Sequence, residues 1–399
     1  MTGLRDVVVV GGSVGGYRTA GALRRRGYDG RLRVISAEPL GNYYRPALSK
    51  GFLSGDQDET NLVLPLADDL DLDVWPGAIA TALDPARRRL TVGRDGDSEE
   101  LTYDGLVIAT GLAPRRLPLP DLTGTHYVRE LAEADVLRSE LAAGPRVVVI
   151  GGGLIGCEVA ATCRGLGLDV TVVDTADRLL APVLGPTVGS IVTELHRAQG
   201  VHVRTGVGVA GLHGHGRVEA VTLSDGTRLD ADVVVVAVGS VPRTGWLSGS
   251  GFDLTDGVLC TDNLSVLGAD SVVAVGDVAR TRTPTGATVR IEHWENAARQ
   301  ADVAARTLLE GADAPPYTAH TMFWSTQYTL QIHVMGRPLS HDVLHVLEGR
   351  LEDMSGAAAY HRDDRVTGII ALNGPQKIRA HRHLLDRALA VNLPGGDQS

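Results

Sequence analysis

Runs of apolar residues typical of buried parallel strands recur along the chain, and two of them lead into a glycine-rich turn and a helical pattern. In the first copy, Asp6 and four valines precede the turn 11–16, and the helical pattern ends near Gly27. In the second, Arg146–Ile150 precedes the turn 151–156, with a helix to about Gly167. A second strand follows each helix, at 32–35 and at 169–174. The chain therefore contains two separate strand–helix–strand units.

Strands that alternate with helices predict a parallel, doubly wound sheet. After residue 314 the pattern changes to β alternation, as in 328–335, and it ends with a helix near 378–390. We predict an α/β protein with two Rossmann-like dinucleotide-binding domains and a C-terminal α+β domain. A proline cluster and Gly239 mark boundaries between domains. The predicted domains are residues 1–115 with 240–314, then 116–239, and then 315–399.

Composition removes several classes of function. An apolar fraction of 43% over 399 residues supports a large core, which argues against wholesale disorder. A net charge of −10 without a basic block argues against a nucleic-acid partner. No apolar run approaches the length of a bilayer span, and the start of the chain has no leader pattern, so we expect no membrane partner and a cytoplasmic location. Three cysteines without a CxxC pair argue against a metal site, a protein-bound iron–sulfur cluster and a disulfide scaffold.

The glycine turns carry the first chemical signal. Glycines let the backbone approach a pyrophosphate, which the free N–H groups of the following helix stabilise. Gly151, Gly153 and Gly156 satisfy the G-x-G-x-x-G pattern, and Asp174 ends the next strand. A carboxylate there can bind both ribose hydroxyls and would repel a 2′-phosphate, which favours NADH over NADPH.

The first turn departs from the pattern at its middle position. Gly11 and Gly16 are in place, Ser13 stands between them, and Glu38 is the matching ribose acid. Two dinucleotide sites in one chain suggest FAD together with a nicotinamide cofactor. Asp277, after a further apolar strand, is either a residue that accepts hydrogen bonds from the ribitol hydroxyls or part of an ordinary turn.

Further motifs extend a likeness over essentially the whole chain. They occur in this order: Tyr44–Lys50, Ala109–Gly111, Gly151–Glu158, Gly276–Ala279, Glu292–Ala297 and Phe323–Tyr328. With these motifs the sequence resembles the oxygenase-coupled ferredoxin reductases, a branch of the two-dinucleotide-binding flavoproteins of the glutathione-reductase structural family. The resemblance implies an FAD-dependent oxidoreductase that takes hydride from NADH, with residues 1–115 and 240–314 as the FAD domain and 116–239 as the NADH domain.

The resemblance also implies roles for individual residues. Arg45 and Lys50 lie where the family binds flavin, Lys50 near the edge that accepts hydride, and Glu158 where the family places the ion-pair partner of that lysine. Lys50 is one of only two lysines in the chain, and an ammonium suits a reduced, anionic flavin better than a guanidinium does. The family positions that contact cofactor are, in this sequence, Ala109, Arg129, Glu292 and Trp294. A surface lysine and a core tryptophan are the alternatives for Lys50 and Trp294, and Trp324 is a candidate for the far wall of the same cleft or a core residue.

Some positions depart from the family pattern. Arg243, Thr326 and Pro182 stand where asparagine, aspartate and a basic residue are usual, and Pro182 bears on the strength of nicotinamide binding. Disulfide reductases carry a cysteine pair in the stretch that is here 43–55, which holds none, so a thiol relay is excluded. Cys157 and Cys163 are expected to be small buried apolar residues.

Three hypotheses of function remain open at this point. In the first, electrons pass from NADH through FAD to a [2Fe–2S] ferredoxin that serves a monooxygenase or dioxygenase. Arg280, Arg282 and Arg290 would then form a positive docking rim for an acidic ferredoxin, or they are ordinary surface arginines. The second hypothesis is an NADH oxidase or diaphorase, and the third is a flavin-based NADH redox sensor. The sequence does not distinguish a monomer from a homodimer.

Overall fold

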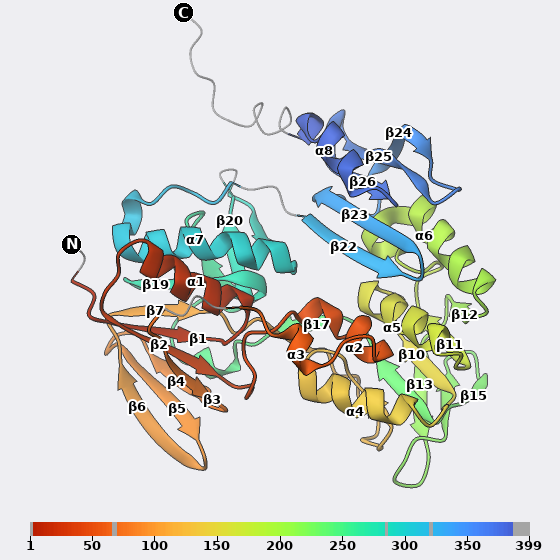
Figure 1. The fold of residues 1–399 in the computed structure, drawn as a ribbon, viewed down its shortest axis with the longest axis horizontal. Coiled ribbons are helices and arrows are strands. Elements are labelled where there is room, and N and C mark those ends of the chain that lie inside the picture. Colours follow the sequence, from red (N-terminus) through yellow and green to blue (C-terminus); the bar gives the residue numbers. More distant parts are fainter. Residues whose placement is uncertain (1–2, 66–69, 284–285, 319–321, 386–399) are drawn as a thin grey trace, which may run out of the picture. The chain divides into compact units, whose positions relative to one another are not determined.

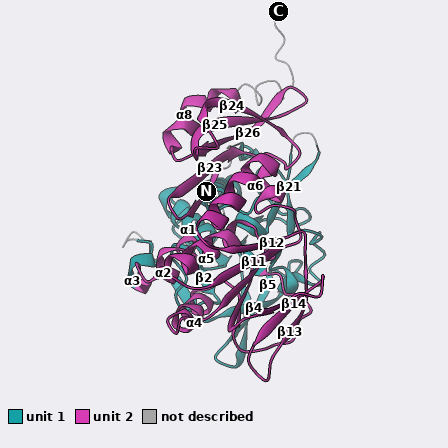
Figure 2. Cartoon of the chain, turned by 90° about the vertical axis from the view of Figure 1, so that its right-hand side faces the viewer, with its two compact units in different colours: residues 1–44, 60–113, 240–321 teal, residues 45–59, 114–239, 322–399 magenta. Residues whose placement is uncertain are grey.

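The computed structural model describes residues 3–65, 70–283, 286–318 and 322–385 (Figure 1). Contacts between residues divide the chain into two compact units (Figure 2). Unit 1 comprises Met1–Tyr44, Thr60–Ala113 and Ser240–Thr321, and unit 2 comprises Arg45–Glu59, Pro114–Gly239 and Met322–Ser399. Each unit is therefore built from segments that are far apart in the sequence.

Unit 1 is organised around a five-stranded parallel sheet of order β19-β7-β1-β2-β3. The strands are β1 (Asp6–Val10), β2 (Arg31–Ser36), β3 (Asp73–Pro76), β7 (Gly105–Ile108) and β19 (Val272–Ala274). Helices α1 (Val14–Arg25) and α7 (Trp294–Glu310) lie side by side on one face of this sheet (Figure 1). Small residues of both helices, such as Ala20 and Ala304, pack with β1 valines in one apolar cluster, which accounts for the close approach of the two helices.

Unit 1 also contains an antiparallel three-stranded sheet and a mixed three-stranded sheet. One consists of β4 (Ile79–Asp84), β5 (Arg89–Arg94) and β6 (Asp97–Thr102). In the other, β20 (Ala279–Arg282) lies between β18 (Val258–Cys260) and β21 (Thr288–Arg290), and only the β20–β21 pair is antiparallel. The shorter elements are α3 (Glu59–Leu62) and the mutually paired strands β8 (Leu112–Pro114) and β17 (Ser240–Pro242).

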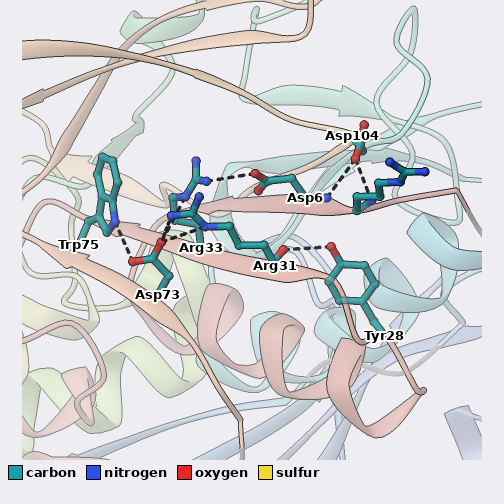
Figure 3. A network of polar contacts seen from close by, with 8 residues as sticks. Asp6, Tyr28, Arg31, Arg33, Asp73, Trp75 and Asp104 are labelled. Atoms are coloured by element: carbon teal, nitrogen blue, oxygen red, sulfur yellow. Dashed lines mark hydrogen bonds and ion pairs between the residues drawn. The ribbon is translucent and has the colours of Figure 1, made fainter.

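An ionic cluster joins the first three strands of the unit 1 sheet (Figure 3). The guanidinium of Arg33, with a side chain only 5% exposed, lies 3.0 Å from Asp6 and 3.4 Å from Asp73. Trp75 donates its indole N–H to Asp73 over 2.9 Å, and the exposed Arg31 pairs with the same aspartate. A buried cation is costly unless it is paired, so the two carboxylates are what permits a buried arginine in β2.

Unit 2 repeats the nucleotide-binding architecture with a parallel sheet of order β12-β11-β10-β16-β9. Its strands are β9 (Thr125–His126), β10 (Val147–Ile150), β11 (Val170–Asp174), β12 (His202–Thr205) and β16 (Val233–Val236). Its helices are α2 (Gly51–Ser54), α4 (Leu131–Leu141), α5 (Leu154–Gly165) and α6 (Ala181–Ala198). A small antiparallel sheet follows, made of β13 (Val209–His213), β14 (Ala220–Leu223) and β15 (Arg228–Asp230).

The C-terminal part of unit 2 is an antiparallel sheet of order β22-β23-β26-β25-β24. Its elements are β22 (Met322–Gln327), β23 (Leu330–Gly336), β24 (Val343–Arg350), β25 (Ser355–Arg362), β26 (Arg365–Leu372) and α8 (Pro375–His381). Buried residues of this sheet, including Phe323 and Tyr360, share one apolar cluster with Val159 of α5 and Val188 of α6. The nucleotide fold and the C-terminal sheet therefore have a common core.

The fold class predicted from the sequence is confirmed, with both strand–turn–helix units in place and the sheet of strands after residue 321. The contact division differs in detail from the predicted domains, because residues 45–59 group with unit 2 and the later boundary falls after residue 321. The three-domain boundaries stay a prediction. The last predicted helix begins as α8, and its residues beyond 385 lie outside the described part of the chain. In the described residues, no helix has the length and apolar character needed to cross a membrane.

Candidate functional site

The glycine turn of unit 1 is closed by direct backbone contact. Gly11 has φ +123°, and a Cβ at this position would lie 2.2 Å from the carbonyl oxygen of Ala109. A Cβ at Gly16 would lie 1.9 Å from the carbonyl oxygen of Gly11. Both glycines are therefore required by the fold itself, because no side chain fits between the end of β1, the start of α1 and the strand end at Ala109.

The turn of unit 2 has the same construction. Gly151 has φ +108°, and a Cβ there would lie 2.4 Å from the carbonyl oxygen of Ala237. A Cβ at Gly156 would lie 1.9 Å from the carbonyl oxygen of Gly151. The two turns are thus structural duplicates that bring the start of a helix close to the end of a strand.

The middle position of each turn is different, because the protein itself does not require a small residue there. A Cβ at Gly153 would have no described protein atom within 4 Å, and its φ of −76° is open to any residue. Ser13, the equivalent residue, is the N-cap of α1, yet its hydroxyl makes no capping hydrogen bond in the described structure. Serine at an N-cap ordinarily caps the helix. Space at Gly153 and an uncommitted hydroxyl at Ser13 fit a pyrophosphate at each helix start, as FAD and NADH would supply.

The two predicted ribose acids take part in local hydrogen bonds. Asp174 accepts hydrogen bonds from the backbone N–H of Ala176 at 2.6 Å and from that of Gly152. Glu38 accepts a hydrogen bond from the hydroxyl of Tyr43 at 2.6 Å. The Asp174 carboxylate is therefore held at the glycine turn of unit 2, whereas the Glu38 carboxylate is held by Tyr43, and ribose binding by either stays a prediction.

Asp277 and Glu292 both contact Arg290. Arg290 donates to the backbone oxygen of Asp277 at 3.2 Å and pairs with the Glu292 carboxylate at 2.7 Å. Glu292 also accepts a hydrogen bond from the hydroxyl of Ser240 at 2.8 Å. The side chain of Glu292 is 41% exposed, so it can still meet a ligand.

The expected arginine rim is wrong for two of its three members. The side chains of Arg280 and Arg290 are each 11% exposed, and they pair with Asp253 and with Asp256 and Glu292. Asp253 and Asp256 lie outside the sequence stretch that suggested the rim, which is why charge spacing along the chain misjudged it. Only Arg282 is exposed.

Trp294 begins helix α7 and contacts an aromatic ring and a cation. The ring of Tyr44 meets it edge-on, with centroids 5.6 Å apart, and the Arg18 guanidinium lies 5.3 Å from its centroid. Such contacts fix the plane of a large aromatic side chain. A fixed plane suits stacking against a flat ligand, and this role for Trp294 stays a prediction.

Lys50 forms the expected ion pair with Glu158 in unit 2. The ammonium Nζ lies 2.6 Å from the carboxylate of Glu158, whose side chain is only 3% exposed, while the lysine side chain is 23% exposed. Ser49 and Ser325 donate their hydroxyls to the same carboxylate at 2.6 and 2.7 Å. Nζ also donates to the backbone oxygen of Pro46 at 3.0 Å. Because the carboxylate is buried and held by two serine hydroxyls, it fixes the position of the ammonium, which is the more exposed end of the pair.

Arg45 and Arg129 are brought together in unit 2. A guanidinium N–H of Arg45 donates to the backbone oxygen of Arg129, next to the N-terminus of α4. The backbone N–H of Arg129 is in turn held by Glu133 of that helix at 3.0 Å. Contact of either arginine with a flavin stays a prediction.

The predicted site residues divide between the two units. Unit 1 holds Gly11, Ser13, Gly16, Glu38, Ala109, Asp277, Glu292 and Trp294. Unit 2 holds Arg45, Lys50, Arg129, Gly151, Gly153, Gly156, Glu158 and Asp174. In unit 2 the structure joins the glycine turn to Asp174 through Gly152, and it joins Lys50 to Glu158.

The three cysteines are free, buried residues, which confirms the interpretation of Cys157 and Cys163 as small apolar side chains. Burial raises the pKa of the Cys163 and Cys260 thiols to about 12. A thiol with such a pKa carries almost no thiolate at neutral pH and is a poor nucleophile. The cysteines therefore belong to the core.

Sequence reasoning missed the polar residues that surround Glu158. Ser49, Ser325, Gln327 and His196 are all buried, and none was singled out from the pattern. A signal was present for His196, because it lies on the apolar face of α6 beside the buried Val192 and Leu195. A polar residue on a buried face needs a partner.

Comparisons with known proteins agree with this arrangement. Residues 5–301 match the family model described as pyridine nucleotide-disulphide oxidoreductase, and residues 322–394 match the reductase C-terminal model. The chain is 35% identical to a ferredoxin--NAD(P)(+) reductase of a Sphingomonas species, over 98% of this chain and 94% of that protein. It is 33% identical to the putidaredoxin reductase of Pseudomonas putida, over 98% and 94% of the two chains. Among solved structures it resembles the reductase in a covalent putidaredoxin reductase–putidaredoxin complex, with a TM-score of 0.89, 33% identity and coverage of 96% and 93%.

Proposed function

This chain belongs to the pyridine nucleotide-disulphide oxidoreductase family, and we propose that it is an FAD-dependent ferredoxin–NAD(+) reductase that serves an oxygenase. The observation that carries the proposal is the pair of duplicated glycine turns in one chain, each with space or a free hydroxyl at its middle position. Two such turns suit two dinucleotides, one resident and one exchanging. The names of the relatives, which are ferredoxin reductases and a putidaredoxin reductase, supply the acceptor class.

In this proposal, different residues bind the two cofactors. Gly11, Ser13, Gly16 and Glu38 would hold FAD in unit 1, and Gly151, Gly153, Gly156 and Asp174 would hold NADH in unit 2. The bound flavin would accept a hydride from NADH and pass its two electrons singly to two ferredoxin molecules, with release of one proton. The Lys50 ammonium, positioned by Glu158, would favour the reduced, anionic form of the flavin.

Asp174 makes NADH the preferred donor in this proposal. Its carboxylate is held by two backbone N–H groups, so it cannot swing aside to admit a 2′-phosphate without breaking both hydrogen bonds. The carboxylate and a 2′-phosphate are both negatively charged, so they would repel each other. A cytoplasmic location is part of the same proposal, because NADH is available there.

The visible spectrum of the purified protein, followed by titration with NADH and NADPH, tests the cofactors. We expect a yellow protein with bound FAD, bleached by NADH at far lower concentration than by NADPH. A colourless protein that takes up no added FAD would overturn the proposal.

Ferredoxin-dependent reduction of cytochrome c tests the acceptor. We expect NADH-dependent turnover that requires a small [2Fe–2S] ferredoxin. Fast oxygen consumption without ferredoxin would instead select an oxidase, and a long-wavelength absorption band that persists in air after NADH addition would select a redox sensor. Absence of turnover with plant-type and adrenodoxin-like ferredoxins alike would contradict the reductase function.

A further inference from the structure

A chain of buried polar side chains leads away from Glu158 within unit 2. Ser325 Oγ lies 2.7 Å from the Glu158 carboxylate, and Gln327 Nε2 lies 3.2 Å from Ser325 Oγ. Beyond them, His196 Nε2 lies 3.0 Å from Gln327 Oε1, and the Tyr328 hydroxyl lies 3.1 Å from His196 Nδ1. The chain thus runs from the hairpin turn after β22, through α6, back to the partner of Lys50.

The burial of this chain is costly. Ser325, Gln327 and His196 are each 0% exposed, and Phe323, Leu330 and Val192 of the same elements are buried in an apolar cluster. Apolar side chains of similar size would pack there without a desolvation penalty. A fully satisfied polar network makes its members rigid and fixes their orientation. This fixed orientation is the benefit that would offset the desolvation penalty.

The hydrogen bonds can be arranged in only one direction. A carboxylate only accepts, so the Ser325 hydroxyl must donate to Glu158, and the Ser325 oxygen is left to accept from the amide nitrogen of Gln327. The Gln327 oxygen then faces His196 Nε2, which must carry the proton, and Nδ1 accepts from Tyr328. Burial lowers the pKa of His196, although the hydrogen bond to Gln327 opposes this, so the ring is neutral as the arrangement requires. Every donor in the chain therefore points toward Glu158.

The far end of the chain is anchored by a strained residue. Tyr328 has φ +53°, in the left-handed region that residues other than glycine adopt at a cost. Its ring meets the His196 ring edge-on, with centroids 5.2 Å apart. Burial raises the pKa of its hydroxyl, so the hydroxyl stays protonated and donates a hydrogen bond to Nδ1. The turn therefore holds the first donor in place.

We propose that Gln327 is a positioning residue, which acts through Ser325 to fix the Glu158 carboxylate and, through that carboxylate, the Lys50 ammonium at the flavin. This inference rests on the proposed function, which supplies the flavin that Lys50 would contact. The chain does not carry protons, because the Gln327 amide would have to tautomerise to pass one on. The hydrogen bonds orient the Glu158 carboxylate, and because all their donors point toward it, each bond strengthens the next.

Gln327→Leu is the test variant, since leucine is close to glutamine in size and removes both hydrogen bonds. Gln331→Leu, on the next strand of the same hairpin, is the matched control, because Gln331 is exposed. Both are compared with the wild type for flavin content, for the midpoint potential of the flavin, and for the rate constant of flavin reduction and the NADH dissociation constant in stopped-flow experiments.

We expect Gln327→Leu to bind FAD and to lose about tenfold in the rate constant of reduction, with NADH affinity changed less than about twofold. The same tenfold effect on the reduction equilibrium would shift the midpoint potential by about 30 mV to more negative values. In a Glu158→Gln background the Gln327→Leu change should add less than about twofold, because the residue acts through Glu158. Equal effects in both backgrounds, or none in either, would overturn the proposal, and Gln331→Leu should match the wild type.

Nuclear magnetic resonance of ¹⁵N-histidine-labelled protein separates this proposal from the proposed function, because it needs no flavin. At pH 7, His196, assigned with a His196→Asn variant, should carry its proton on Nε2 in the flavin-free wild type. The Nδ1–H tautomer or an imidazolium would overturn the one-way chain. If the wild type failed to bind FAD but His196 carried its proton on Nε2, the proposed function would be contradicted, whereas the series of hydrogen bonds to Glu158 would stand.

Discussion

The residue Gly153 separates what the fold needs from what a ligand needs. Gly151 and Gly156 cannot accept a Cβ without collision with backbone, whereas a Cβ at Gly153 would meet no described atom. Gly153→Ala should therefore leave the free energy of unfolding within about 0.5 kcal/mol of the wild type and weaken NADH binding at least about tenfold. Urea unfolding and NADH titration of the holoprotein measure the two effects.

Gly165→Ala is the control for that variant. Gly165 ends the same helix, α5, and its Cβ position is also open, so alanine there should be neutral or slightly stabilising and should leave NADH affinity unchanged. Equal NADH affinity in Gly153→Ala and Gly165→Ala would show that no pyrophosphate approaches the turn.

Lys50 is a second residue whose chemistry can be tested by a small change. Lys50→Arg keeps the charge but replaces a compact ammonium by a planar guanidinium, which does not fit the site between the Glu158 carboxylate and the Pro46 carbonyl in the same way. We expect the rate constant of flavin reduction by NADH to fall about tenfold or more. Lys377→Arg is the matched control, because Lys377 is the other lysine and its ammonium donates to the Ser355 hydroxyl over 3.4 Å in an exposed contact. A rate equal to the wild type in both variants would assign Lys50 to the surface.

At the level of elements, the turn between β23 and β24 depends on one buried carboxylate. Asp342 accepts hydrogen bonds from Arg362, Thr367 and the backbone N–H of Leu339. Burial pushes the pKa of Asp342 upward, but these donors outweigh it and lower the pKa to about 2. Its stabilising effect is therefore complete above the unfolded value of 3.8 and is lost as the pH falls toward 2.

Asp342→Asn should lower the free energy of unfolding by about 2 kcal/mol at pH 7. The difference from the wild type should persist to pH 5 and shrink below pH 4, when measured by urea unfolding across that range. Asp353→Asn, at a side chain 64% exposed, is the control and should change the free energy by less than about 0.5 kcal/mol. A difference independent of pH would rule out the ionised carboxylate as its source.

The ionic cluster of β1, β2 and β3 makes a second prediction about elements (Figure 3). Arg33→Met would leave Asp6 and Asp73 without their buried cation, and we expect a loss of about 2 kcal/mol in the free energy of unfolding. Arg31→Met removes a cation that is 56% exposed from the same Asp73 and should cost less than about 1 kcal/mol. Similar losses in the two variants, measured by urea unfolding, would contradict the importance of burial.

The elements that sequence patterns could predict are those defined by local signals. Runs such as Val7–Val10 and Val147–Ile150, each followed by a glycine turn, depend on neighbouring residues only, and they form the expected parallel strands. Local signals could not predict the hydrogen-bond partners of Glu158, because Ser49 and Ser325 are 109 and 167 residues away from it in the sequence. Composition drew attention to Lys50 as one of two lysines, but its pairing with Glu158 came only from the resemblance.

At the level of the whole molecule, net charge bears on the encounter with the acceptor. The chain carries a net charge of −10, and Arg280 and Arg290 are committed to internal carboxylates, so little positive surface remains in the stretch 280–290. An acidic ferredoxin would then meet repulsion at long range, which salt screens over about 10 Å at 0.1 M ionic strength. We expect kcat/KM for such a ferredoxin to rise as ionic strength increases from about 10 mM to about 150 mM.

Two arginine variants show whether any positive charge in this stretch assists association. Arg282→Gln removes the exposed member and should lower kcat/KM for ferredoxin about twofold at low ionic strength, with NADH kinetics unchanged. Arg280→Gln breaks the pair with Asp253 and should lower stability while the association rate stays the same. A steep fall of kcat/KM with salt would reveal an attractive surface elsewhere on the molecule, because attraction between opposite charges weakens as it is screened, and it would show that net charge does not govern the encounter.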